Sequence, residues 1–75
     1  MRFFQRQRID FIFAKLAESG SIRRADIMAA FEVSIAQASL DLREAMAIRP
    51  DAMVYNKTAR QYESRAGRVK DVETV

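Results

Sequence analysis

Hydrogen-bonding side chains suited to recognition gather in one stretch of the chain, at Ser34, Gln37, Ser39 and Arg43. Hydroxyl, amide and guanidinium groups bind partners by donating or accepting hydrogen bonds. The sequence has no cysteine and no histidine, which removes thiol and imidazole catalysis, excludes a disulfide framework and disfavours a zinc or haem site. We therefore expect a binding protein with no cofactor and no metal, and not an enzyme.

The chain has 75 residues, which is enough for one small domain. Its formal net charge of +3 is compatible with a polyanionic partner but too small to demonstrate one. No apolar run approaches the roughly 18 residues of a membrane span. Charges at Arg2, Arg6, Arg8 and Asp10 also interrupt the N-terminal region, where a signal peptide needs an apolar core. We expect a cytoplasmic protein that does not contact a membrane.

The first element that must position these groups is a helix over residues 5–19, which Gly20 ends in a left-handed conformation. Its apolar residues have the spacing of one buried helical face. They are Ile9, Ile12, Phe13, Leu16 and Ala17.

Three phenylalanine residues lie outside that apolar face: Phe3, Phe4 and Phe11. Their rings either pack under the domain or contact a second copy or a neighbouring domain. We expect a homodimer with this region as its contact. Arginines near these phenylalanines form a basic arm, which consists of Arg2, Arg6 and Arg8. We expect their guanidinium groups to face solvent or phosphate.

A second helix is predicted over residues 24–31, preceded by Ile22, which should point inward. Its inner side carries Ile27, Met28 and Phe31. Arg23 stands just before the helix, where serine or threonine caps better, and Ser21 can serve instead.

A turn at Glu32, Val33 and Ser34 separates this helix from a third one. Val33 should fill the core. Ser34 is a good N-cap, and Gln37 three residues later completes a capping-box pattern. The third helix then runs over residues 35–48, because Pro50 cannot continue it. Its predicted inner face carries Ala38, Leu42 and Ala45.

The pattern changes after Pro50 to two short runs of β-branched and aromatic residues, 53–56 and 60–63, separated by residues 57–59. They predict a small β-hairpin. Tyr55 and Tyr62 should be cross-strand partners with their rings on the core. Residues 64–75 are mostly polar and are expected to be a tail or a truncated linker, which leaves a domain over residues 1–63.

The predicted fold is therefore mainly α with a small β-hairpin, in the order of a winged helix-turn-helix: three helices plus a wing. A helix is narrow enough to enter the major groove of double-stranded DNA, and the wing can reach the backbone. The candidate DNA contacts on the third helix are Ser34, Ile35, Ala36, Gln37, Ser39, Leu40 and Arg43. Candidates on the wing are Lys57, Thr58 and Arg60.

Several of these candidates have a second interpretation. Gln37 either reads a base or folds back to cap its own helix. Arg23 and Arg24 either grip a phosphate at the start of the second helix or lie on a solvated face.

The chain resembles the N-terminal winged helix-turn-helix of bacterial WYL-domain transcriptional regulators. The resemblance covers residues 5–63, and its most specific part is Ser34, the run Gln37-Ala38-Ser39, the pair Asp41-Leu42 and the two wing tyrosines. It implies a sequence-specific, usually dimeric DNA-binding regulator, often a repressor, whose complete form carries C-terminal ligand-sensing domains. Glu32 departs from the pattern, since such turns often have glycine at a left-handed position.

The alternative function is a winged helix that binds or dimerises with proteins and does not bind DNA. The surplus of phenylalanine around the first helix favours it. So do acidic residues near the third helix, which are Glu32, Asp41 and Glu44.

Overall fold

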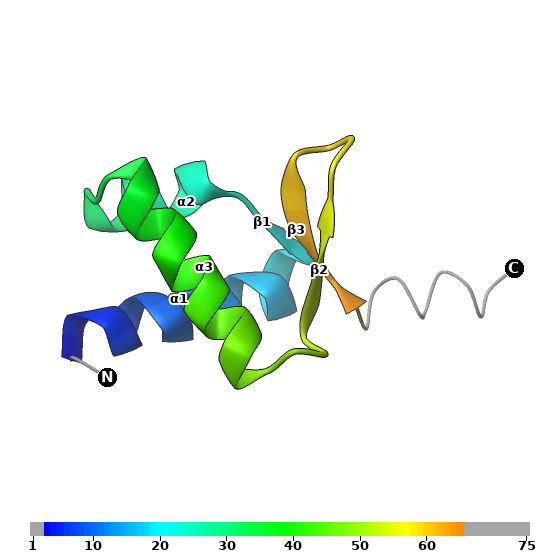
Figure 1. The fold of residues 1–75 in the computed structure, drawn as a ribbon, viewed down its shortest axis with the longest axis horizontal. Coiled ribbons are helices and arrows are strands. Elements are labelled where there is room, and N and C mark those ends of the chain that lie inside the picture. The colour runs from blue at the N-terminus through cyan, green and yellow to red at the C-terminus, as the bar shows by residue number, and fades with distance from the viewer. Residues whose placement is uncertain (1–2, 66–75) are drawn as a thin grey trace, which may run out of the picture.

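The computed structural model of the chain describes residues 3–65, with Phe3 described by its backbone alone. Figure 1 shows three helices beside a small sheet, with α3 crossing α1. In chain order the elements are α1 (Phe3–Ser19), β1 (Ser21–Ile22), α2 (Arg24–Phe31), α3 (Ile35–Ile48), β2 (Met53–Asn56) and β3 (Gln61–Ser64). The predicted fold class, three helices plus a hairpin wing, is confirmed.

The helix α1 buries the predicted face at Ile9, Ile12 and Leu16, and it begins two residues earlier than expected, at Phe3. Ala17 was expected on that face but is exposed. At 3.6 residues per turn, Ala17 lies about 100° around the helix from the centre of the three buried side chains. Gly20 ends the helix as predicted, with φ of +78°. Within the described residues, no helix is long and apolar enough to cross a membrane.

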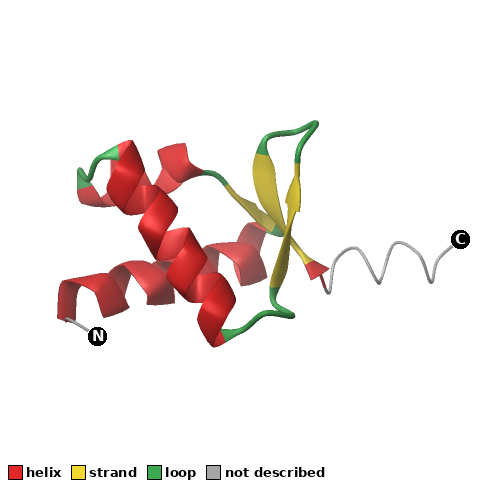
Figure 2. Ribbon diagram, viewed as in Figure 1, coloured by secondary structure: helices red, strands yellow, loops and turns green. Residues whose placement is uncertain are grey.

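The hairpin is part of a three-stranded antiparallel sheet with strand order β1-β3-β2. The sequence predicted only a connection where β1 lies, because a strand of two residues has no readable alternation. β1 pairs Ser21 with Glu63 and Ile22 with Tyr62, and Ile22 is fully buried as expected. Figure 2 shows the strands gathered at one end of the molecule, beyond the C-terminal end of α1.

The strand β3 is shifted by one residue from the prediction, because Arg60 adopts a left-handed conformation with φ of 54° and ends the turn. β3 extends to Ser64, whose N–H donates to the carbonyl of Gly20 at 2.8 Å. The predicted boundary between residues 63 and 64 therefore falls inside this strand. The rest of the predicted tail, residues 66–75, lies outside the described residues.

The core lies where the three helices meet the sheet, and every element except β3 contributes a buried apolar side chain to it. Its buried apolar side chains are Ile9, Ile12, Leu16, Ile22, Ile27, Ala38, Leu42, Ala45 and Met53. Phe11 packs against this core, with its ring edge-to-face on Phe31 at a centroid distance of 5.3 Å. The packed interpretation is therefore the correct one for Phe11.

A charged residue, Asp41 of α3, is also fully buried in this core. The Nε of Arg8 in α1 donates to Asp41 Oδ2 at 2.6 Å, and Arg8 Nη2 lies 3.4 Å from Oδ1. The Nε2 of Gln37 donates to Oδ1 at 3.0 Å. The expectation that Arg8 faces solvent or phosphate is wrong, because a buried carboxylate needs a cationic or hydrogen-bonding partner.

We predict that Arg8→Ala strongly destabilises the fold, because it leaves the carboxylate of Asp41 buried without its cation. The free energy of unfolding should fall by about 3 to 5 kcal/mol, measured by urea denaturation with circular dichroism. Arg6→Ala is the matched control, since Arg6 is exposed on the same helix, and it should change stability by less than about 0.5 kcal/mol. Equal midpoints for the two variants would show that the ion pair is dispensable.

Candidate nucleic-acid interface

The turn between α2 and α3 has the predicted geometry. Glu32 is left-handed, with φ of 54° and ψ of 46°, and its N–H donates to the carbonyl of Met28 at 2.8 Å. Val33 is half-buried against the core, and the Oγ of Ser34 accepts from the N–H of Gln37 at 3.1 Å. The turn therefore fixes where α3 begins and which way its first turn faces.

One face of α3 is buried and the opposite face is open to solvent. The buried positions are Ala38, Asp41, Leu42 and Ala45. The exposed positions are Ile35, Ala36, Leu40, Arg43, Ala47 and Ile48. Within α3, which is described in full, Arg43 is the one fully exposed charged residue, since Asp41 is buried and Glu44 is half-buried. The open face is thus mainly apolar, with a single guanidinium.

Two polar candidates on α3 are engaged inside the molecule. The side chain of Gln37 bonds Asp41, so the predicted reciprocal capping box is wrong and only its Ser34 half forms. The Oγ of Ser39 accepts from Arg24 Nη1 at 3.3 Å. The contact between Gln37 and Asp41 was not predicted from the sequence. Their i, i+4 spacing allows a side-chain hydrogen bond, but only the burial of Asp41 makes that bond necessary.

The two arginines at the start of α2 are each tied to a neighbouring element. Arg24 reaches Ser39 on α3, and the Nε of Arg23 donates to Gln61 Oε1 on β3 at 3.2 Å. The expectation that Ser21 caps α2 is wrong, since Ser21 belongs to β1 and Arg23 is the N-cap residue. The carboxylate of Asp26 instead accepts from the backbone N–H of Arg23 at 2.8 Å. The guanidinium groups therefore lie between the wing and α3.

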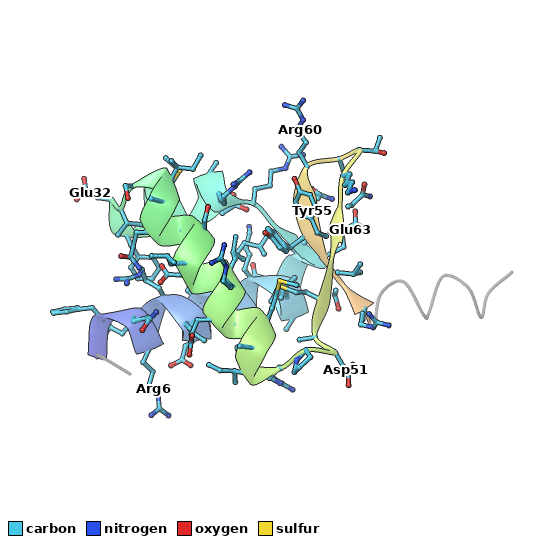
Figure 3. All side chains as sticks on the ribbon, viewed as in Figure 1. Arg6, Glu32, Asp51, Tyr55, Arg60 and Glu63 are labelled. Atoms are coloured by element: carbon cyan, nitrogen blue, oxygen red, sulfur yellow. The ribbon has the colours of Figure 1, made fainter. Side chains whose placement is uncertain are left out.

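The tip of the wing is held by Asn56. Its Oδ1 accepts from the backbone N–H groups of Thr58 and Ala59, each at 3.0 Å. An asparagine just before a turn favours this arrangement, so the sequence alone carries a signal for it. The candidates Lys57, Thr58 and Arg60 are all exposed around this tip, and Figure 3 shows Arg60 pointing away from the helices.

The polar face of the sheet joins the wing tip to the start of α2. The Nδ2 of Asn56 and the Nε2 of Gln61 each donate to Glu63 Oε2 at 3.0 Å, and Gln61 also binds Arg23. Neither Gln61 nor Glu63 has a pattern in the sequence that marks it as a site residue. The missing information was the pairing of β1 with β3, which brings Arg23 beside Gln61.

The wing tyrosines are cross-strand partners, as predicted, with ring centroids 4.8 Å apart. Tyr62 packs against the core. Tyr55 is 37% exposed, so the expectation that its ring also lies on the core is wrong. The core ends at Met53, two residues before Tyr55 on the same face of the strand.

Comparison with known proteins decides the family. Residues 5–67 match the winged helix-turn-helix domain of BrxR transcriptional regulators. The chain belongs to this family. The match confirms the resemblance to the winged helix-turn-helix of WYL-domain transcriptional regulators.

Two relatives of this BrxR-type domain carry the description DNA-binding transcriptional repressor CapW. The one from Escherichia coli strain KTE188 is 38% identical over 63 residues, which is 84% of this chain and 21% of the relative. The one from Stenotrophomonas maltophilia is 37% identical over 62 residues, 83% of this chain and 21% of the relative. The chain thus spans about a fifth of the length of these relatives.

We predict that Glu32→Gly stabilises the domain. A non-glycine residue in the left-handed region is strained, and glycine relieves that strain at some cost in unfolded-chain entropy, for a net gain of about 0.5 to 1 kcal/mol. Thermal unfolding measures it. Ala30→Gly is the control, because Ala30 is exposed within α2 and should lose about 1 kcal/mol. A loss in both variants would contradict the strain at Glu32.

Proposed function

We propose that this chain is the sequence-specific double-stranded DNA-binding module of a bacterial transcriptional regulator that acts as a repressor. In this proposal α3 enters the major groove and the hairpin wing contacts the backbone. The observation that carries the proposal is a helix-turn-helix with an open face on α3, in a chain that belongs to a family of transcriptional regulators. The description of the CapW relatives as DNA-binding repressors supports it.

The open face of α3 supplies the proposed base contacts. These are Ile35, Ala36, Leu40 and Arg43, and the guanidinium of Arg43 can bond a guanine edge through two hydrogen bonds. Ser34 and Ser39 can each donate a hydroxyl proton to phosphate or base while their oxygens accept the internal bonds. We leave Gln37 out of the proposed contacts, because its amide holds the buried carboxylate of Asp41.

Phosphate contacts come from the start of α2 and from the wing in this proposal. Arg23 and Arg24 are each held by one nitrogen, so further N–H groups remain on the guanidinium to meet a phosphate. Lys57, Thr58 and Arg60 lie on the wing. Such contacts set affinity and register without reading sequence.

The alternative of a protein-binding winged helix loses two of its supports in the structure. Phe11 is used inside the molecule, against Phe31. The charge of Asp41 is buried and paired with Arg8. DNA binding therefore remains the function that the geometry supports best.

We predict salt-sensitive binding of the chain to DNA sites selected from a random pool, measured by fluorescence anisotropy at several salt concentrations. Lys57→Ala should weaken binding to all sequences alike and reduce the slope of log affinity against log salt by about one. Arg43→Ala should mainly erode discrimination, by about 1 to 3 kcal/mol at one base pair.

The control for both variants is Arg6→Ala, because Arg6 lies beside Ile48 at the far end of α3. It should leave affinity and slope unchanged. Failure of the wild-type chain to bind any DNA at low salt would contradict the proposed function.

We also propose that the chain acts as a homodimer on a two-fold symmetric site, as helix-turn-helix proteins commonly do. The contact proposed from the sequence was Phe3, Phe4 and Phe11. Phe11 is removed from it by its packing on Phe31, and the side chain of Phe3 lies outside the described residues. Phe4 remains, with 69% of its surface exposed at the start of α1.

Sedimentation equilibrium on free and DNA-bound protein tests the dimer. We expect Phe4→Ala to lower the dimer fraction while leaving the circular dichroism spectrum unchanged, because Phe4 contributes little to the core. Phe11→Ala is the contrasting variant and should lower stability instead, since it opens a cavity beside Phe31. A wild-type chain that binds a symmetric site with one protomer would contradict the dimer.

A further inference from the structure

We propose that α3 selects DNA mainly through the methyl groups of thymine, with one guanine read by Arg43. The preferred half-site would then carry thymine in the major groove under Ala36 and Leu40, and a G·C pair under Arg43. This inference rests on the proposed function and names the class of DNA site that it takes.

The side-chain amide of Gln37 on α3 is bonded inside the molecule. Turning Gln37 toward a base would remove a hydrogen bond from Asp41, a carboxylate with no exposed surface. A buried charge that loses a hydrogen bond is destabilised strongly. Gln37 therefore stays on Asp41, and the bidentate adenine contact that glutamine can make is not offered.

The hydroxyl of Ser39 is also bonded inside the molecule. Its oxygen accepts from Arg24, and arginine has no acceptor, so the direction of this bond is fixed. The hydroxyl proton and one oxygen lone pair of Ser39 remain for DNA. A hydroxyl that can both donate and accept discriminates weakly among bases, because it can bond either an acceptor such as purine N7 or the amino group of a base.

Apolar side chains of α3 are left in contact with solvent. Leu40 is 51% exposed and Ile35 is 56% exposed, and together with Ile48 near the C-terminal end they place all the exposed large aliphatic residues of the described chain on α3. Ala36, Leu40 and Arg43 follow one another at i, i+4 and i+7 along the same side of α3. Apolar surface gains free energy when it leaves water.

The major groove offers one apolar group, the C5-methyl of thymine. The distance along α3 from Ala36 to Arg43 is about 10 Å at 1.5 Å per residue. This length corresponds to about three base pairs at 3.4 Å each. The row formed by Ala36, Leu40 and Arg43 can therefore span neighbouring base pairs. Ala36 and Leu40 can contact thymine methyls, and the longer Arg43 can reach a guanine at the C-terminal end of the row.

Replacing thymidine by deoxyuridine in the selected site tests the inference, because this change removes only the methyl and keeps the hydrogen-bonding edge. Wild-type affinity should fall about fourfold for each contacted methyl, the factor expected for exposing one methyl-sized apolar group. In the Leu40→Ala variant the penalty at one thymine should vanish. Ile48→Ala is the matched control, since Ile48 is an exposed aliphatic residue at the other end of α3, and it should keep the full penalty.

The possible results distinguish the thymine-methyl inference from the proposed DNA-binding function. Specific binding that is unchanged by deoxyuridine overturns the thymine-methyl inference and leaves DNA binding standing. A penalty that persists in full in Leu40→Ala also overturns the assignment to this face. Absence of specific binding to any selected site contradicts the proposed function itself.

Discussion

The buried carboxylate of Asp41 is the constraint on which the rest of the structure depends. A charge without exposed surface must be matched inside the protein, and here Arg8 of α1 and Gln37 of α3 match it. This ties α1 to α3 where the two helices cross, so the orientation of α3 is set by a directional contact as well as by apolar packing. The bond to Asp41 also keeps the side-chain amide of Gln37 away from the open face. The open face of α3 is therefore left with apolar side chains and the guanidinium of Arg43.

In the proposed function, base recognition and phosphate binding come from different parts of the surface. The apolar stripe of α3 with Arg43 supplies selectivity, and the arginines at the start of α2 supply phosphate binding. Gln61 and Ser39 each hold one of those arginines, so in this proposal both would orient a phosphate-binding guanidinium. Asn56, Glu63 and Gln61 connect the wing tip to the same region. The wing and the helix-turn-helix are therefore one hydrogen-bonded unit.

The sequence predicted the helices and the hairpin closely because these elements are specified locally. Ser34 caps α3, Gly20 ends α1 and Pro50 lies beyond the end of α3, and each of these effects needs only near neighbours. The errors concern long-range contacts. The strand β1 exists only through its partner β3, and Arg8 looked like a surface arginine until Asp41 was placed opposite it. Likewise, Gln37 and Ser39 have the right chemistry for base reading, and only the fold reveals that neighbouring side chains occupy them.

Backbone chemical-shift mapping by NMR, with a selected duplex added to labelled protein, tests the central claim most directly. The claim is that DNA meets the face of α3 that the contact between Arg8 and Asp41 positions. It predicts that the largest shifts lie at Ala36, Leu40 and Arg43, with a second group at Thr58 on the wing, and that Arg6 and Asp10 on α1 stay unchanged. Shifts concentrated around Arg6 and Asp10, with α3 unperturbed, would contradict it.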